Sequence, residues 1–152
     1  SRYAYRPRST QSNQAAPSLA MTAEGLLMQQ YLGWQPDNAY LRDGAEYLKA
    51  NLPSFGTPSV RTRDCYYWYY ATLGLYQAGG DPWQRWNAAL QRNLLATQRT
   101  DGASAGSWDP DPIWGRTGGR VYSTALCALC LEVYYRYLPL YVQAAGRDNR
   151  VK

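Results

Sequence analysis

Two segments of the chain are apolar on nearly every side of a helix, and this feature restricts the fold more than any other. The first covers residues 65–71, with the sequence CYYWYYA, and the second covers residues 125–131, with the sequence ALCALCL. A helix without a polar face is stable in water only when other elements surround it. The chain is therefore predicted to contain two helices that lie inside a group of others.

Capping and breaking residues divide the chain into about five helices. The predicted helices cover about 18–32, 36–52, 63–77, 81–98 and 121–137. Ser18 and Asp81 are expected to cap two of them, and Pro139 ends the last. The residues between 100 and 119 are rich in Gly, Ser, Asp and Pro and are predicted to form a loop without regular structure. No segment alternates as a strand does, so the predicted class is all-α.

The helices over 36–52 and 81–98 differ from these two in having one apolar face. In 81–98, apolar residues recur at three- and four-residue spacing, namely Trp83, Trp86, Leu90 and Leu94. An alternation of amphipathic and buried helices predicts two layers. A small-x-x-small-Leu pattern also begins at Thr22, Ala71 and Ala125, so a helical hairpin of about 50 residues is predicted to repeat.

The positive charge lies in the chain ends. The net charge is +5, but residues 9–146 hold ten Lys and Arg against ten Asp and Glu. Nucleic-acid recognition needs a basic patch on the folded body, so specific nucleic-acid binding is not expected. Composition and charge together divide the chain into a flexible leader (1–17), a helical segment (18–145) and a basic tail (146–152).

Several classes of protein are disfavoured by what the chain lacks. It has no His, which excludes Ser-His-Asp and Cys-His catalysis and imidazole metal sites. Cys127 and Cys130 form a C-x-x-C, but it lies in an apolar helix without further ligands, so they are interpreted as core residues. No metal or cofactor is predicted. No apolar run approaches the ~20 residues of a membrane-spanning helix.

The beginning of the chain carries neither an initiator Met nor a signal peptide. Residue 1 is therefore predicted to be a processing site or a cut within a longer protein. Nothing in the sequence indicates a compartment.

One stretch resembles a known family. Residues 94–108 read LLATQRTDGASAGSW and are followed by WGR at 114–116 and YSTAL at 122–126. This is similar to the Q…G-S-W segment of squalene and terpenoid cyclases, in the prenyltransferase and squalene-cyclase repeat group, and the similarity covers about 65–138. The resemblance implies a partial α/α toroid of inner and outer helical hairpins.

The residues of this motif have a structural interpretation. Gln98 can bond open backbone groups at a helix end, and the ring of Trp108 can cover the loop that Gly106 allows to turn. These three residues are predicted to clamp neighbouring hairpins rather than to bind a ligand.

The departures from the family concern catalysis. Squalene-type cyclases carry D-x-D-D at the start of an inner helix, whereas the corresponding helix here begins RTRDCY, with Asp64 as its one acid. Arg63 beside it is expected to hold Asp64 ionised, which is the wrong state for an acid catalyst. The Asp-Cys-His zinc site of prenyltransferases lacks its His, and complement-type toroids carry a thioester segment that is missing here. Such rings have roughly six hairpins, so further hairpins or self-association are expected to complete this one.

Two groups of residues remain as site candidates. The aromatic residues can line a cavity, as they do around carbocations in cyclases, or can simply pack the layer; they are Tyr66, Tyr67, Trp68, Tyr69, Tyr70 and Trp114. Asp109 and Asp111, in a D-P-D-P loop, can form an acid pair or cation site or merely a rigid turn. With Asp64, they are the weak catalytic candidates.

The sequence favours a binding function over catalysis by this chain alone. The first hypothesis is a non-catalytic or incomplete terpenoid cyclase-like repeat domain that binds a hydrophobic small molecule or a protein partner. The second is a part of a cyclase-type enzyme whose catalytic residues lie outside this chain, and the third is a carbohydrate-active α/α toroid.

Overall fold

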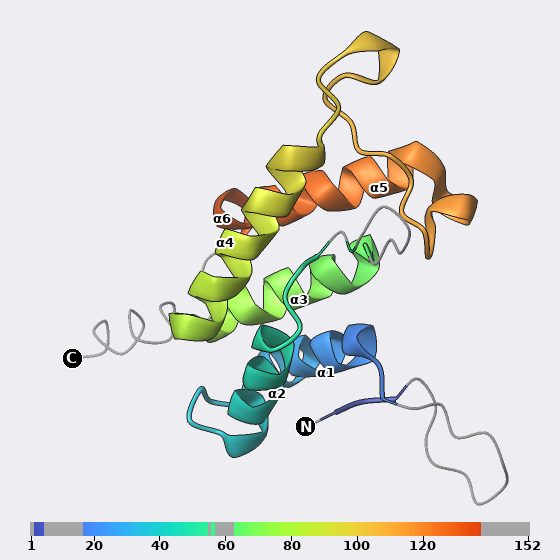
Figure 1. The fold of residues 1–152 in the computed structure, drawn as a ribbon. Coiled ribbons are helices and arrows are strands. Elements are labelled where there is room, and N and C mark those ends of the chain that lie inside the picture. The colour runs from blue at the N-terminus through green and yellow to red at the C-terminus, as the bar shows by residue number, and fades with distance from the viewer. Residues whose placement is uncertain (1, 5–16, 55, 57–62, 138–152) are drawn as a thin grey trace, which may run out of the picture.

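The computed structural model describes residues 2–4, 17–54, 56 and 63–137. Every regular element within these ranges is a helix, which confirms the predicted all-α class (Figure 1). In chain order the elements are α1 (Leu19–Tyr31), α2 (Ala39–Lys49), α3 (Cys65–Ala78), α4 (Gly80–Thr97), the 3-10 helix η1 (Gly102–Ser104), α5 (Gly115–Leu131) and α6 (Val133–Arg136). None of these helices is long and apolar enough to cross a membrane.

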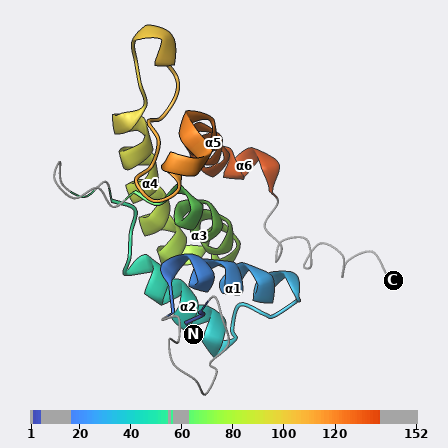
Figure 2. The same ribbon diagram turned by 90° about the vertical axis from the view of Figure 1, so that its right-hand side faces the viewer.

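Helix α3 is the centre of the fold. It contacts α1, α2, α4, α5 and α6. In Figures 1 and 2, α1, α3 and α5 form one row, and α2 and α4 cover one side of it. Nine residues of α3 are buried: Cys65, Tyr67, Trp68, Ala71, Thr72, Leu73, Gly74, Leu75 and Gln77. The prediction that residues 65–71 are surrounded is therefore confirmed, and the helices do form two layers.

The two layers meet at Trp86. This side chain of α4 is fully buried, and its indole N–H donates to the hydroxyl of Thr72 on α3 at 3.0 Å. Its ring meets Tyr67 edge to face, with 5.4 Å between the centroids. Leu90 and Leu94, which follow at helical spacing, are also buried. The predicted apolar face of the 81–98 segment is thus the face that packs on α3.

Polar side chains begin the first three helices. The Ser18 hydroxyl accepts a hydrogen bond from the backbone N–H of Met21, as predicted, and Asn38 caps α2 in the same way. Helix α4 differs from its prediction, because Asp81 makes no capping bond. Its carboxylate binds Arg85 at 2.9 Å and Lys49 at 3.1 Å instead.

The region from residue 100 to residue 137 is more structured than predicted. The expected loop contains η1 and a helical turn that begins at Gly115 and is broken at Gly119, where φ is +66°. The predicted single helix over 121–137 ends at Leu131, and α6 follows it. A Gly-rich sequence has low helix propensity, so local patterns concealed this turn. Residues 100–119 therefore do not form a loop without regular structure.

Helix α5 lies at the edge of the row that α1, α3 and α5 form. The buried residues of α5 are Gly115 and a stripe formed by Ser123, Cys127 and Cys130, whereas Val121 is 82% exposed. Ala125, which begins the third copy of the small-residue pattern, is exposed as well. The prediction that residues 125–131 are surrounded is wrong for this structure, because among the described helices α5 packs mainly against α3.

The first described residues run along α1. The backbone carbonyl of Tyr3 accepts a hydrogen bond from the N–H of Ser18 at 3.0 Å, and the backbone N–H of Tyr3 donates to the hydroxyl of Thr22 at 3.2 Å. The Tyr3 ring covers Gly25 so closely that a Cβ there would lie 2.6 Å from it. The rest of the predicted leader and the basic tail lie outside the described residues.

Candidate ligand-binding cleft

The start of each inner helix contributes to one cleft of about 860 Å³. Its walls are the first turn of α1, the first turn of α3 and the beginning of α5. The lining residues are Ser18, Leu19, Ala20, Met21, Asp64, Tyr66, Ile113, Trp114, Thr117, Gly118 and Tyr122. Most of them present apolar or aromatic surface, and Asp64 is the one acid among them. Small-molecule sites combine apolar walls with a few polar groups in this way.

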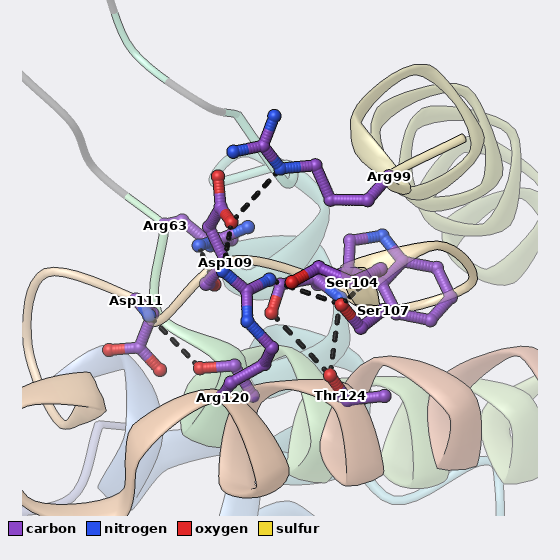
Figure 3. A network of polar contacts seen from close by, with 10 residues as sticks. Arg63, Arg99, Ser104, Ser107, Asp109, Asp111, Arg120 and Thr124 are labelled. Carbon is purple, nitrogen blue, oxygen red and sulfur yellow. Dashed lines mark hydrogen bonds and ion pairs between the residues drawn. The ribbon is translucent and has the colours of Figure 1, made fainter. Parts of the chain in front are cut away.

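Asp64 caps α3 and lies in the cleft wall. Its Oδ1 accepts from the backbone N–H of Tyr67 at 3.0 Å. Burial raises the pKa of its carboxyl, the carboxylate of Asp111 raises it further, and the backbone N–H bonds at the start of α3 lower it in part. The predicted effect of Arg63 is wrong, because that guanidinium donates to the backbone carbonyl of Asp109 (Figure 3). The tertiary fold thus supplies the second carboxylate that the local sequence lacks.

The raised pKa of Asp64 predicts a pH-dependent effect of Asp64→Asn. A folded state that binds the proton more tightly than the unfolded chain is stabilised below the unfolded pKa of about 3.9 and loses that stabilisation as the pH rises through the folded pKa. Asn caps helices as well as Asp does and does not titrate. Thermal unfolding should therefore show Asp64→Asn gaining stability relative to wild type between pH 4 and pH 7.

The control for this prediction is Asp101→Asn, at an exposed position. As a substitution at the surface, it should change stability by less than about 0.5 kcal/mol. A pH-independent or opposite change for Asp64→Asn would contradict the assignment.

Asp111 starts the helical turn at the head of α5. It is only 2% exposed, and its Oδ1 accepts from the N–H groups of Ile113, Trp114 and Gly115 at 2.9, 2.7 and 3.2 Å. Its own N–H donates to Ser123 at 2.9 Å. Its Oδ2 is buried and has no hydrogen-bond partner. This carboxylate therefore positions the two cleft residues that follow it.

Asp109 has a different environment. It binds Arg120 at 2.6 Å and Arg99 at 3.2 Å, and these guanidinium groups lower the pKa of its carboxyl. In Figure 3 it points toward Arg99 and Arg120, whereas the carboxylate of Asp111 points away from both. The predicted acid pair or cation site does not form, because Arg120 and Arg99 hold the carboxylate of Asp109, whereas the carboxylate of Asp111 accepts from the backbone N–H groups of the following turn.

The three clamp residues lie where α4 meets the following loop. Gln98 donates to the carbonyl of Gly106 at 2.9 Å, and φ of Gly106 is +79°. The indole N–H of Trp108 donates to the carbonyl of Leu94 at 2.9 Å, and its backbone N–H donates to Thr124 of α5 at 3.2 Å. These contacts join α4 to α5, and none of the three residues lines the cleft.

The aromatic candidates separate into two groups. Tyr66 and Trp114 line the cleft, with 6.3 Å between their ring centroids, and Tyr70 packs beside Tyr66 at 4.9 Å. Tyr67 and Trp68 are buried in the core instead. Tyr69 is partly buried against Tyr70 and does not line the cleft. Helical geometry requires this separation, because consecutive residues point about 100° apart.

Some cleft residues were not predicted from the sequence. Tyr122 and Ile113 are the clearest examples, since each comes from a segment that was interpreted as a helix start or a loop. Burial, with the charges of Asp111 and Asp64, raises the pKa of Tyr122 to about 12. What marks these two residues as cleft residues is their position near the start of α5. That position depends on the extra helical turn at Gly115, which the sequence does not predict.

The cysteines are core residues. The sulfur atoms of Cys65 and Cys127 lie 3.7 Å apart, and Cys130 is buried beside them. The hydrogen bond to Cys127 and burial raise the pKa of Cys65, and burial raises the pKa of Cys130, which disfavours reactive thiolates. Within the described part of the chain, no group of three or more His, Cys, Asp or Glu residues could hold a metal ion.

Comparisons with protein-family models, with curated proteins and with solved structures find no match for this chain. The resemblance to the prenyltransferase and squalene-cyclase repeat group therefore stays a prediction.

Proposed function

We propose that this chain binds a hydrophobic small molecule in the cleft at the starts of α1, α3 and α5. The observation that carries the proposal is the cleft itself, with about 860 Å³ of space between mostly apolar and aromatic walls. Ligand sites of small molecules have volumes of roughly 300–1,000 Å³. Such a concave surface fits a small molecule better than the flat contact of a protein partner.

The layer arrangement is compatible with a non-catalytic or incomplete terpenoid cyclase-like repeat domain. Inner helices α1, α3 and α5 alternate along the chain with outer helices α2 and α4. The exposed side of α5, with Val121, is where a further hairpin or another copy would pack in a partial α/α toroid. The cleft then lies at one end of the inner row.

Binding can be measured through Trp114, which is in the cleft wall and 50% exposed. Farnesol, an isoprenoid alcohol, is expected to change the tryptophan emission in a saturable manner. Trp114→Phe should abolish most of that change while calorimetry still detects binding. Tyr66→Ala should weaken affinity by about tenfold, because it removes an aromatic wall.

The matched control is Trp83→Phe. Trp83 packs against Tyr76 and Tyr134 and does not line the cleft, so its replacement should leave the change intact. An emission change that survives Trp114→Phe and disappears in Trp83→Phe would refute the proposed site. A response to maltooligosaccharide but not to farnesol would favour a carbohydrate-active toroid.

One observation favours a second candidate, the cyclase-type enzyme. The raised pKa of Asp64, in an apolar cleft beside Asp111, is typical of a group that can donate a proton. If the full-length protein converts an isoprenoid substrate, Asp64→Asn should reduce kcat by at least about 100-fold with little change in KM. Unchanged turnover would remove Asp64 from that role.

A further inference from the structure

We propose that the cleft selects hydrophobic molecules that carry an ammonium group, and that this group binds beside Asp64 against the rings of Tyr66 and Trp114. The inference rests on the proposed function, because it names the chemical class of ligand for the same cleft. It is carried by the carboxylates, the aromatic rings and the distribution of charge at the cleft.

The first argument is an unsatisfied carboxylate behind the cleft wall. Asp111 is 98% buried, and its Oδ1 is held by the N–H groups of Ile113 and Trp114, both of which line the cleft. Its Oδ2 has no partner. A buried carboxylate oxygen without a partner is costly, and a nearby cation lowers that cost. Asp64, in the wall itself, lies close enough to Asp111 for the two carboxyl groups to interact electrostatically.

The second argument is the balance of charge. The backbone N–H groups at the start of α3 and of the turn at Gly115 could bind an anion, but they already donate to the carboxyl oxygens of Asp64 and Asp111. Arg99 and Arg120 pair with the carboxylate of Asp109, and Arg63, which donates to the backbone carbonyl of Asp109, is not among the residues that line the cleft. The site is therefore expected to prefer a cation over an anion.

The third argument is the aromatic wall. Cations are attracted to the faces of aromatic rings within about 6 Å, and tryptophan is the strongest partner. Tyr66 and Trp114 lie next to each other in the wall, with a centroid separation of 6.3 Å. An ammonium group can thus meet ring faces on one side and a carboxylate on the other.

The test compares three ligands with the same apolar body, namely geranylamine, geraniol and geranic acid, by calorimetry with the wild-type chain at pH 7. The amine should bind at least about tenfold more tightly than the alcohol, and the acid more weakly than the alcohol. Asp64→Asn, which keeps a capping oxygen, should remove the preference for the amine, so that geranylamine and geraniol bind with affinities within about twofold of each other.

Asp109→Asn is the matched control, because it removes one nearby negative charge that is outside the cleft. It should leave the amine preference unchanged. In the wild-type chain the ratio of amine to alcohol affinity should also fall as the pH is lowered through the pKa of Asp64, a result that needs no variant to fold.

The outcomes separate the two proposals. If none of the three ligands binds, the proposed function itself fails. If geraniol binds as tightly as geranylamine, hydrophobic binding stands and the ammonium preference is wrong. If geranic acid binds most tightly, the helix N-termini dominate the site and the inference is overturned. An amine preference that Asp109→Asn removes but Asp64→Asn does not would also overturn it.

Discussion

Trp86→Ala is expected to lower the free energy of unfolding by about 3–5 kcal/mol, measured by urea denaturation followed by circular dichroism. The indole of Trp86 is fully buried between the two helix layers. Its removal leaves a large cavity, deprives Thr72 of a buried hydrogen-bond donor and removes an edge-to-face contact with Tyr67. Domains of this size have a total stability of only about 5–15 kcal/mol, so the variant should be close to unfolding.

Two further substitutions on α4 act as controls. Trp86→Phe keeps most of the apolar surface and loses the N–H bond to Thr72, so a smaller loss of about 1–2 kcal/mol is expected. Gln84→Ala, at an exposed position of the same helix, should change stability by less than about 0.5 kcal/mol. If Trp86→Ala cost no more than Gln84→Ala, α4 would not pack on α3 through this residue.

Asp111→Ala is expected to cost about 2–4 kcal/mol, whereas Asp109→Ala, two residues away, should cost less than about 1 kcal/mol. Asp111 holds three backbone N–H groups that would lose their acceptor in a largely buried place. Asp109 makes ion pairs whose partners are partly exposed, and such pairs contribute little. Thermal or urea unfolding of the two variants side by side measures the difference.

Asp111→Asn refines this prediction. The amide oxygen can still accept the three N–H bonds, and the unpartnered charge of Oδ2 disappears. Its stability at pH 7 should therefore be much closer to wild type than that of Asp111→Ala. Equal losses for Asp109→Ala and Asp111→Ala would show that Asp111 does not start the turn at Gly115.

Local patterns were sufficient for the central part of the fold. The apolar run from Cys65 to Ala71 has no polar face, and burying it from all sides is the one way to remove it from water. The spacing of Trp86, Leu90 and Leu94 identified the face of α4 that packs on α3. These inferences depend on side-chain polarity and helical period alone, and both are properties of a short segment.

The candidate cleft was only partly predictable. Tyr66 and Trp114 were named as binding candidates and do line it, but Tyr67 and Trp68 from the same run lie in the core. Asp64 was expected to be ionised by its neighbour Arg63. Its environment depends instead on burial and on Asp111, which is distant along the chain. Electrostatic interactions act through space, so adjacency in the sequence was a poor guide.

The amino-acid sequence by itself determined the all-α class, the burial of the 65–71 run and the face of α4 that packs on α3. Only the tertiary structure decided that the heads of three inner helices meet, that a carboxylate from a D-P-D-P loop builds a helical turn there, and that α5 remains exposed on one side. The physical reason is that helix formation and amphipathicity are set by neighbours within one or two turns. A binding site, by contrast, is set by which distant segments share a desolvated space.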